Sequence, residues 1–271
     1  MKKFIIGLTI LLLCMAGSAF GQAGGCMVPG TNISCLNAYF GVMVGGMWST
    51  MTGDGTTEQG IDVKRRTGLS LGAFFEYPFA NNLFVQPEIK YIQKGMKKTH
   101  TYDAGEFTRL GKISAVDADG PSDEVTLSYI QIPVLVKYVF PLEGKIKPSI
   151  MLGPSLAINL SAKDKASGWG AGWDGDFDII NAKKWEISGV IGAGVAFPVG
   201  KLTFGVDVRY DKGFTNVFDD VTQEELNDLG SDETAWTGNN LEGFEAKNGG
   251  FGFSASVILP IGAGKSDDDT P

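Results

Sequence analysis

The sequence predicts an all-β fold, an eight-stranded antiparallel up-and-down transmembrane β-barrel. Three observations predict it. Apolar and polar residues alternate along several long segments, which is the period of a strand and not of a helix. A hydrophobic residue followed by proline recurs at Pro78, Pro141, Pro198 and Pro260, with spacings of 63, 57 and 62 residues. Short and long connections alternate between the segments, as they do in bacterial outer-membrane barrels.

Eight segments are predicted as strands. They are residues 38–50, 65–77, 83–94, 124–140, 146–161, 185–197, 202–211 and 250–259. The fifth segment is the clearest, because every even-numbered residue from Ile146 to Leu160 is apolar or proline, whereas the odd-numbered residues are mostly small or polar. The third and seventh segments alternate in the same way.

Small residues and prolines mark the remaining segments. Glycine, serine and alanine alternate with apolar residues in the second and sixth segments, at Gly68, Ser70, Gly72, Gly192, Gly194 and Ala196. The second, fourth, sixth and eighth segments end at the recurrent prolines, because proline cannot donate the next ladder hydrogen bond. Four other prolines lie inside predicted strands, where we expect β-bulges: Pro87, Pro133, Pro148 and Pro154.

The connections predict how the barrel is oriented. Connections after the second, fourth and sixth segments are tight, and the other four are long, covering residues 51–64, 97–123, 162–183 and 218–248. Outer-membrane barrels have short periplasmic turns and longer extracellular loops. We therefore predict a barrel domain over residues 38–261 in the outer membrane of a Gram-negative cell, with both termini in the periplasm and membrane lipid as a partner.

The segments outside the barrel carry separate predictions. Residues 1–21 have the basic start, short apolar run and small-residue site of a secretory signal peptide, with cleavage expected near Gly21. The alternative, an uncleaved anchor, is disfavoured because the apolar run is shorter than the ~20 residues of a spanning helix. Residues 22–37 would form a periplasmic segment in which Cys26 and Cys35 are either a disulfide or two free thiols. Residues 262–271 form a polar tail.

Composition excludes several classes of function. The chain has 271 residues, and its 31 acidic residues outnumber its 23 lysines and arginines, for a net charge of -8. A nucleic-acid-binding protein needs a basic surface, so no nucleic-acid partner is expected. His100 is the single histidine, which argues against a histidine-rich metal site. The motifs indicate no cofactor.

A secreted soluble barrel with an apolar interior is the alternative to a membrane barrel. The polar face favours the membrane barrel, because its small residues and its charges of both signs suit a narrow interior. Aromatic residues of the apolar face also gather near both strand ends, as in the two girdles of membrane barrels. One group comprises Phe40, Tyr77, Tyr138, Phe140, Phe197 and Phe204, and the other comprises Trp48, Tyr91, Trp185, Tyr210 and Phe251.

Charged residues on the polar face are predicted to form a network inside the barrel. The set comprises Glu76, Glu88, Lys90, Lys137, Glu186, Asp207, Arg209 and Asp211, with Lys147 at the start of the fifth segment. Glu88 with Lys90, and Asp207 with Arg209, are two apart on one face and are the expected pairs. Because unpaired buried charges are costly, we interpret the network as a plug. A narrow polar pore or a proton path is the alternative.

Several short motifs carry a family resemblance. They are Gln86-Pro87-Glu88 with Tyr91 and Lys94-Gly95, Tyr129-Ile130-Gln131-Ile132-Pro133 with Lys137-Tyr138, Gly153-Pro154-Ser155, and Arg209-Tyr210 with Gly213 and Thr215-Asn216. These residues resemble the PorT-like outer-membrane β-barrel family of Bacteroidota, also called the porin family. The resemblance implies the barrel and accounts for the internal prolines. It implies no single activity, although the family includes a secretion-system accessory protein.

The last long connection is strongly acidic. It contains Asp219, Asp220, Glu224, Glu225, Asp228, Asp232 and Glu233, then Glu242 and Glu245, with Lys247 at its end. A solvated loop is one interpretation. A docking site for a basic protein partner or a divalent cation is the other. Asp174, Asp176 and Asp178 alternate as in a calcium loop, but the glycine and glutamate of an EF-hand are missing.

No catalytic arrangement stands out. A hydrolase needs a nucleophile beside a general base, and His100 shares a connection with Asp103, Ser114 and Ser122 at spacings typical of no triad. We therefore expect a non-enzymatic protein with a structural or interaction role, played through its surface loops or periplasmic termini. A small passive porin-like channel and an outer-membrane hydrolase centred on His100 are the alternatives.

Overall fold

The computed structural model describes eight stretches of the chain, and everything below concerns these stretches. They are residues 38–53, 61–100, 121–168, 174–179, 181–200, 202–219, 235–236 and 246–261. The predicted signal peptide, Cys26, Cys35, the polar tail and the acidic connection after Asp219 lie outside the described residues, apart from the short strand at 235–236.

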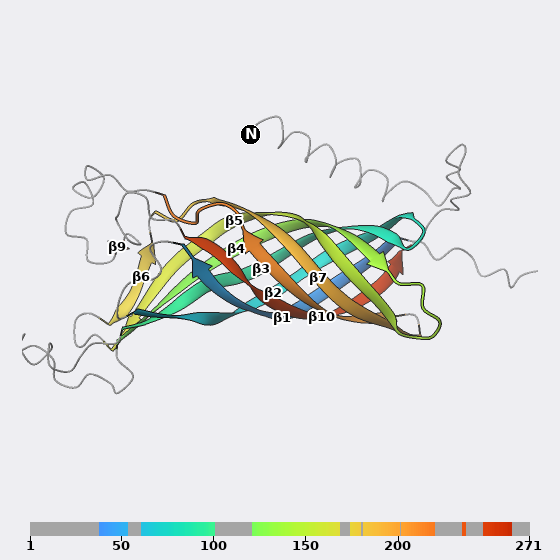
Figure 1. The fold of residues 1–271 in the computed structure, drawn as a ribbon, viewed down its shortest axis with the longest axis horizontal. Helices are drawn as coiled ribbons and strands as arrows, with labels where there is room; N and C mark the ends of the chain where they lie inside the picture. Colours follow the sequence, from blue (N-terminus) through green and yellow to red (C-terminus); the bar gives the residue numbers. More distant parts are fainter. Residues whose placement is uncertain are drawn as a thin grey trace, which may run out of the picture.

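Eight long strands form a closed antiparallel ring (Figure 1). They are β1 (Ala38–Thr52), β2 (Ile61–Ala80), β3 (Leu83–His100), β4 (Ser122–Val139), β5 (Lys147–Ser167), β7 (Trp185–Val199), β8 (Leu202–Gly213) and β10 (Lys247–Ile261). Neighbours in the chain are neighbours in the sheet, and the pairing of β1 with β10 joins the first strand to the last. The predicted eight-stranded up-and-down barrel is confirmed.

Two short strands were not predicted. Strand β6 (Gly175–Ile179) pairs with the end of β5, and β9 (Ala235–Trp236) pairs in parallel with β6. Strands β2, β3 and β5 also run beyond their predicted ends, which shortens the connections predicted at 51–64, 97–123 and 162–183. The prediction missed these parts because polar residues on both faces hide the alternation on which it relied.

The added strand lengths form a sheet that projects beyond the rim. Strand β1 pairs with β2 only as far as Ser49 with Arg66, whereas β2 continues five residues further and pairs there with β3. The pairing of residues at this level continues from β3 to β4, from β4 to β5 and from β5 to β6. Figure 1 shows this end on the left, with β6 and β9 outermost. We call these residues of β2 to β6 the projecting sheet.

The outer face of the barrel is apolar. Val44, Ile191 and Val208 are more than half exposed, and many other large hydrophobic residues share their face. Aromatic pairs mark both ends, with Phe40 near Phe75 and Phe197 near Phe204 at the tight-turn end, and Trp48 near Phe253 and Tyr210 near Phe251 at the other. An aliphatic band between two aromatic girdles is the surface that a bilayer selects. No helix in the described stretches is long and apolar enough to cross a membrane.

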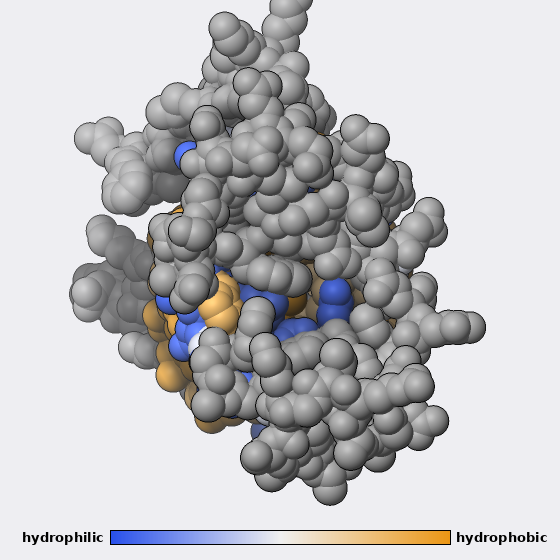
Figure 2. Space-filling view, turned by 90° about the vertical axis from the view of Figure 1, so that its left-hand side faces the viewer, coloured by the Kyte–Doolittle hydropathy of each residue, from blue (hydrophilic) through white to orange (hydrophobic). Residues whose placement is uncertain are grey.

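Hydrophobic residues also fill one end of the interior. Met47, Met51, Met96, Leu127 and Phe218 belong to a buried cluster that lies toward the projecting sheet. Figure 2 looks onto this end and shows hydrophilic side chains near the centre, with hydrophobic ones along the flank. Long unbranched methionines fill irregular space well, so the cluster fills the barrel beneath its long-connection rim.

The predicted bulges at the internal prolines are wrong. The register is unchanged across Pro87 and Pro133, where the ladder skips neighbouring pairs and resumes in step. The register shifts lie between Arg65 and Ser70, near Pro78, and between Ser128 and Tyr129. A proline therefore removes ladder bonds without inserting a residue, because the flanking pairs on both sides hold the strands in place.

A side chain at position 95 would disrupt the packing between β3 and β4, where Gly95 lies. Its φ is +146°, and an added Cβ would lie 1.9 Å from the carbonyl oxygen of Val125. Its backbone N–H donates to Ser49 Oγ at 2.8 Å, and the Ser49 hydroxyl donates to its carbonyl at 3.0 Å. Because both the backbone angle and the space require glycine, we predict that Gly95→Ala lowers the free energy of unfolding by about 2 kcal/mol or more.

Urea unfolding of the folded barrel in detergent measures this loss. Gly144→Ala is the control, since Gly144 has a φ of +114° and no atom within 4 Å of an added Cβ. Equal losses for the two variants would show that the contact with Val125 contributes nothing.

Candidate functional site

One buried ion-pair layer in the interior centres on Lys94, which is 0% exposed. Its ammonium donates to Glu186 Oε1 at 2.8 Å and to Asp211 Oδ1 at 3.2 Å. Lys94 comes from β3, and its two partners come from the neighbouring strands β7 and β8, which lie across the ring from β3. The ion pairs therefore link distant parts of the barrel wall through its interior.

Polar side chains complete the coordination of this layer. Gln131 Nε2 donates to Asp211 Oδ2 at 2.6 Å, and Asn248 Nδ2 donates to Glu186 Oε2 at 2.6 Å. Asn248 also donates to Tyr129 Oη at 3.3 Å, and the Lys94 ammonium lies 5.7 Å from the centre of the Tyr129 ring. Each carboxylate thus accepts from two groups, which compensates for its removal from water.

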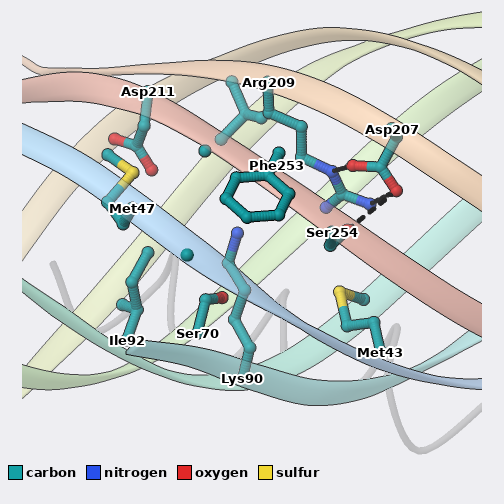
Figure 3. A pocket seen from close by; sticks show the side chains of 13 residues that line it. Met43, Met47, Ser70, Lys90, Ile92, Asp207, Arg209, Asp211, Phe253 and Ser254 are labelled. Carbon is teal, nitrogen blue, oxygen red and sulfur yellow. Dashed lines mark hydrogen bonds and ion pairs between the residues drawn. The ribbon is translucent and has the colours of Figure 1, made fainter. Parts of the chain in front are cut away.

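A second layer centres on Arg209. Its Nη1 donates to both carboxylate oxygens of Glu88, at 2.8 and 2.6 Å, and its Nε donates to Asp207 Oδ1 at 2.5 Å (Figure 3 shows the pair with Asp207). Gln86 Nε2 donates to Glu88 at 2.6 Å, and the Ser254 hydroxyl donates to Asp207 at 2.9 Å. The planar guanidinium matches carboxylate geometry, so Arg209 holds two carboxylates from β3 and β8 at once.

A third ion pair lies toward the tight turns, where Lys137 Nζ donates to Glu76 Oε1 at 2.5 Å. Both side chains are less than 10% exposed. Lys147, which the sequence placed on the inner face, instead donates to the carbonyl of Leu142 at an exposed position beside the turn. Lys147 is therefore a rim residue, because its strand only begins there.

Lys90 differs from the other interior cations. It is 6% exposed, yet Glu88, its predicted partner, is occupied by Arg209, so the expected Glu88–Lys90 pair is wrong. Figure 3 shows the Lys90 side chain extending into a cavity among Met43, Met47 and Phe253. Arg209 Nη1 donates charge-assisted hydrogen bonds to both oxygens of Glu88, so this carboxylate is paired with Arg209 and not with Lys90.

Two small cavities flank the Arg209 layer, and both are lined by Asp207 and Arg209. The first also contains Lys90 and Asp211, and the second contains Lys137. In each cavity the centre of a water molecule can move within a volume of about 20 Å³, which is room for one or two water molecules. The interior therefore has two separate water-sized spaces, with the Arg209 layer between them.

The sequence predicted most of the charged residues of this interior but missed Lys94, the cation at the centre of the first layer. All eight predicted network residues are buried in the structure. Lys94 was missed, although it continues the inward alternation of Glu88 and Lys90. The even-numbered positions of this strand already indicated that Lys94 points inward. It was missed because it is the last residue of the predicted strand.

Other predicted sites are not assembled in the described residues. Asp176 and Asp178 lie on β6 opposite Lys165 and Lys163, so the alternating carboxylates belong to a strand and not to a calcium loop. The described stretches contain no group of three or more histidine, cysteine, aspartate or glutamate residues that could hold a metal ion. The His100 side chain lies outside what the structure describes. Of the acidic residues in the last long connection, the structure describes Asp219, which pairs with Lys183 at 3.3 Å.

The comparisons with known proteins place this barrel in a family. The family model of the outer membrane protein beta-barrel domain matches residues 32–219. The chain belongs to this outer-membrane β-barrel family. Membership agrees with the closed ring, the lipid-facing band and the aromatic girdles, and it places the chain in the outer membrane. The comparison with curated proteins found no match.

Three solved structures are similar to this chain at low sequence identity. Neisserial surface protein A is 12% identical over 82% of this chain and 96% of its own, with a TM-score of 0.39. Ail, the attachment invasion locus protein of Yersinia pestis, is 14% identical over 83% and 100%, with a TM-score of 0.35. OprG from Pseudomonas aeruginosa is 11% identical over 84% and 97%, with a TM-score of 0.40. At this level the similarity does not extend to function.

We predict that Lys94→Met destabilises the barrel strongly. The variant leaves Glu186 and Asp211 buried without their cation, and breaking a buried pair in this way costs about 3 to 5 kcal/mol. Urea unfolding measures the loss. Lys165→Met is the control, because Lys165 is exposed on the projecting sheet and an exposed pair contributes about 1 kcal/mol at most. Equal losses would contradict the role assigned to Lys94.

Asp164 lies outside the membrane and carries a pH-dependent charge. It is six residues beyond Ile158, which pairs with the girdle residue Trp185, so it lies roughly 15 Å past the girdle at ~3.3 Å per residue along a tilted strand. Burial and the neighbouring Asp123 raise the pKa of Asp164 to about 6, against the lowering effect of Lys98. Its Oδ1 is buried and has no hydrogen-bond partner among the described residues.

A raised pKa means that the ionised carboxylate destabilises the folded state. The penalty is fully present above pH ~6 and disappears as the pH falls toward the unfolded value near 4. We predict that the free energy of unfolding of the wild type rises by about 1 to 2 kcal/mol between pH 7.5 and pH 5, relative to Asp164→Asn, after allowance for solvent screening. Unfolding curves at both pH values measure it, with the exposed Asp176→Asn as control. Parallel pH profiles for wild type and Asp164→Asn would refute this assignment.

Proposed function

We propose that this protein is a non-enzymatic outer-membrane barrel that acts through its projecting parts and not by passing solutes. One observation carries the proposal: the interior of the described barrel is filled by successive barriers. These are the Lys137–Glu76 pair, the Arg209 layer, the Lys94 layer and the methionine-rich cluster. An eight-stranded barrel has an interior just wide enough for such side chains, so the charges serve the stability of the wall.

The parts outside the membrane support an interaction role. The projecting sheet extends β2 to β6 beyond the rim and thereby presents a rigid surface beside the acidic connection that begins at Asp219. Rigid elements position binding loops well. A basic protein partner at the acidic connection, or a partner of the periplasmic termini as in a PorT-like secretion accessory, fits this arrangement. Deletion of residues 222–240 should abolish capture of a surface partner while the barrel still folds.

A small channel is the second candidate, because water-sized cavities lie on both sides of the Arg209 layer. Planar-bilayer recording separates the two functions. We predict no steady conductance from the wild-type barrel, since passage would require several buried ion pairs to open together. Insertion must be shown by the gel shift between unheated and boiled samples. A steady wild-type conductance that Arg209→Ala increases would refute the plug and establish the channel.

The hydrolase alternative rests on His100 alone. Full activity of His100→Ala in any hydrolytic assay found for this protein would end that alternative.

A further inference from the structure

The outer face of the projecting sheet carries a cluster of cations next to the membrane. Lys64 and Arg65 of β2 are both exposed, and so is Lys97 of β3. The register shift between Arg65 and Ser70 places an extra residue in β2. Because a bulge interrupts the alternation of faces, two consecutive cations are exposed instead of one. We call Lys64, Arg65 and Lys97 the basic cluster.

Among the described residues, no carboxylate forms an ion pair with Lys64, Arg65 or Lys97. Lys64 lies directly opposite Lys97, and like charges at opposite positions of a sheet destabilise it. Glu124 is the neighbour of Lys97 on β4, but its Oε1 accepts from Arg66 Nε at 2.7 Å. The Nη1 atom of Arg66 is buried and has no hydrogen-bond partner among the described residues. Among the described residues at this corner, the four cations Lys64, Arg65, Arg66 and Lys97 therefore outnumber the two carboxylates of Asp62 and Glu124.

On the β5–β6 side of the projecting sheet, positive and negative charges lie opposite each other. One row of paired residues runs from Lys64 through Lys97, Glu124 and Lys165 to Asp176. Lys165 lies opposite Asp176, and Lys163, two residues earlier in β5, lies opposite Asp178. Lys97, Lys163 and Lys165 thus each lie opposite a carboxylate, although the one opposite Lys97 is taken by Arg66, whereas Lys64 lies opposite another lysine. The imbalance is a local property of β2 and β3 and not of the whole sheet.

The contact that Arg65 makes indicates how deep in the membrane the basic cluster lies. Its guanidinium lies 5.6 Å from the centre of the Phe251 ring, and Phe251 packs with Tyr210 at 4.9 Å in the outer girdle. Aromatic girdles lie at the level of the lipid headgroups. Lys64 is one residue further along the strand, about 3.3 Å away. The cluster therefore faces sideways into the headgroup region of the outer leaflet.

We propose that Lys64, Arg65 and Lys97 bind the phosphate groups of glycolipids in the outer leaflet. A phosphate between Lys64 and Lys97 would relieve their mutual repulsion, and the fork of Arg65 would contact its oxygens from the girdle side. A lipid is favoured over a soluble polyanion because Arg65 packs on a lipid-facing ring. The site is independent of any protein partner and of whether the barrel conducts.

Native mass spectrometry of the folded, detergent-solubilised barrel with diphosphoryl lipid A tests the site. A cation near a membrane surface contributes about 1 kcal/mol, which is about a fivefold change in binding. Lys64→Gln/Lys97→Gln should therefore lower the bound fraction at least tenfold, whereas Lys64→Arg/Lys97→Arg should retain it. The matched control, Lys163→Gln/Lys165→Gln, removes two lysines from the balanced side and should change binding less than twofold. Heat-modified gel mobility verifies folding of each variant.

Three results would overturn the proposal. One is equal binding of lipid A stripped of its phosphates, and another is equal loss in the matched control. The third is a soluble inorganic polyphosphate that binds the cluster and is not displaced by lipid A, which would assign the cluster to soluble polyanions. We expect binding to be lost when lipid A is stripped of its phosphates. Among the variants, we expect it to be lost only in Lys64→Gln/Lys97→Gln.

Discussion

A sheet that crosses a membrane must have no free edge, and the rest of this structure depends on that constraint. Lipid offers no partner for a backbone N–H or carbonyl, so every ladder bond must be made within the protein. The pairing of β1 with β10 and of β4 with β5 completes the ring. Closure with eight strands leaves a narrow interior, and the small residues and paired charges inside follow from that width.

The narrow interior explains why its charges are held so closely. Four lysines and arginines and five carboxylates lie among the predicted network and Lys94, and most of them are less than a tenth exposed. Buried ion pairs add little net stability in general but become costly when one partner is lost. Lys94 and Arg209 each bridge carboxylates from more than one strand. They act as cross-links whose removal the barrel tolerates poorly.

Beyond the rim the constraint changes, since water can satisfy an open edge. Strands β2 to β6 continue there as the projecting sheet, with charges on its outer face and Asp164 buried in it. We expect the electrostatics of this sheet to respond to pH, because Asp164 is buried in it with a raised pKa.

The sequence by itself determined the fold class, the strand order and the inner face. These follow from local rules, since alternation identifies strands such as 146–161 and proline identifies their ends. Only the tertiary structure decided which charges meet. Glu88 is two residues from Lys90 but pairs with Arg209, which is 121 positions away in the chain, because the ring brings β3 and β8 to face each other across its interior. The sequence did not predict the projecting sheet for a related reason. Its strands are polar on both faces, and their pairing depends on partners distant in the sequence.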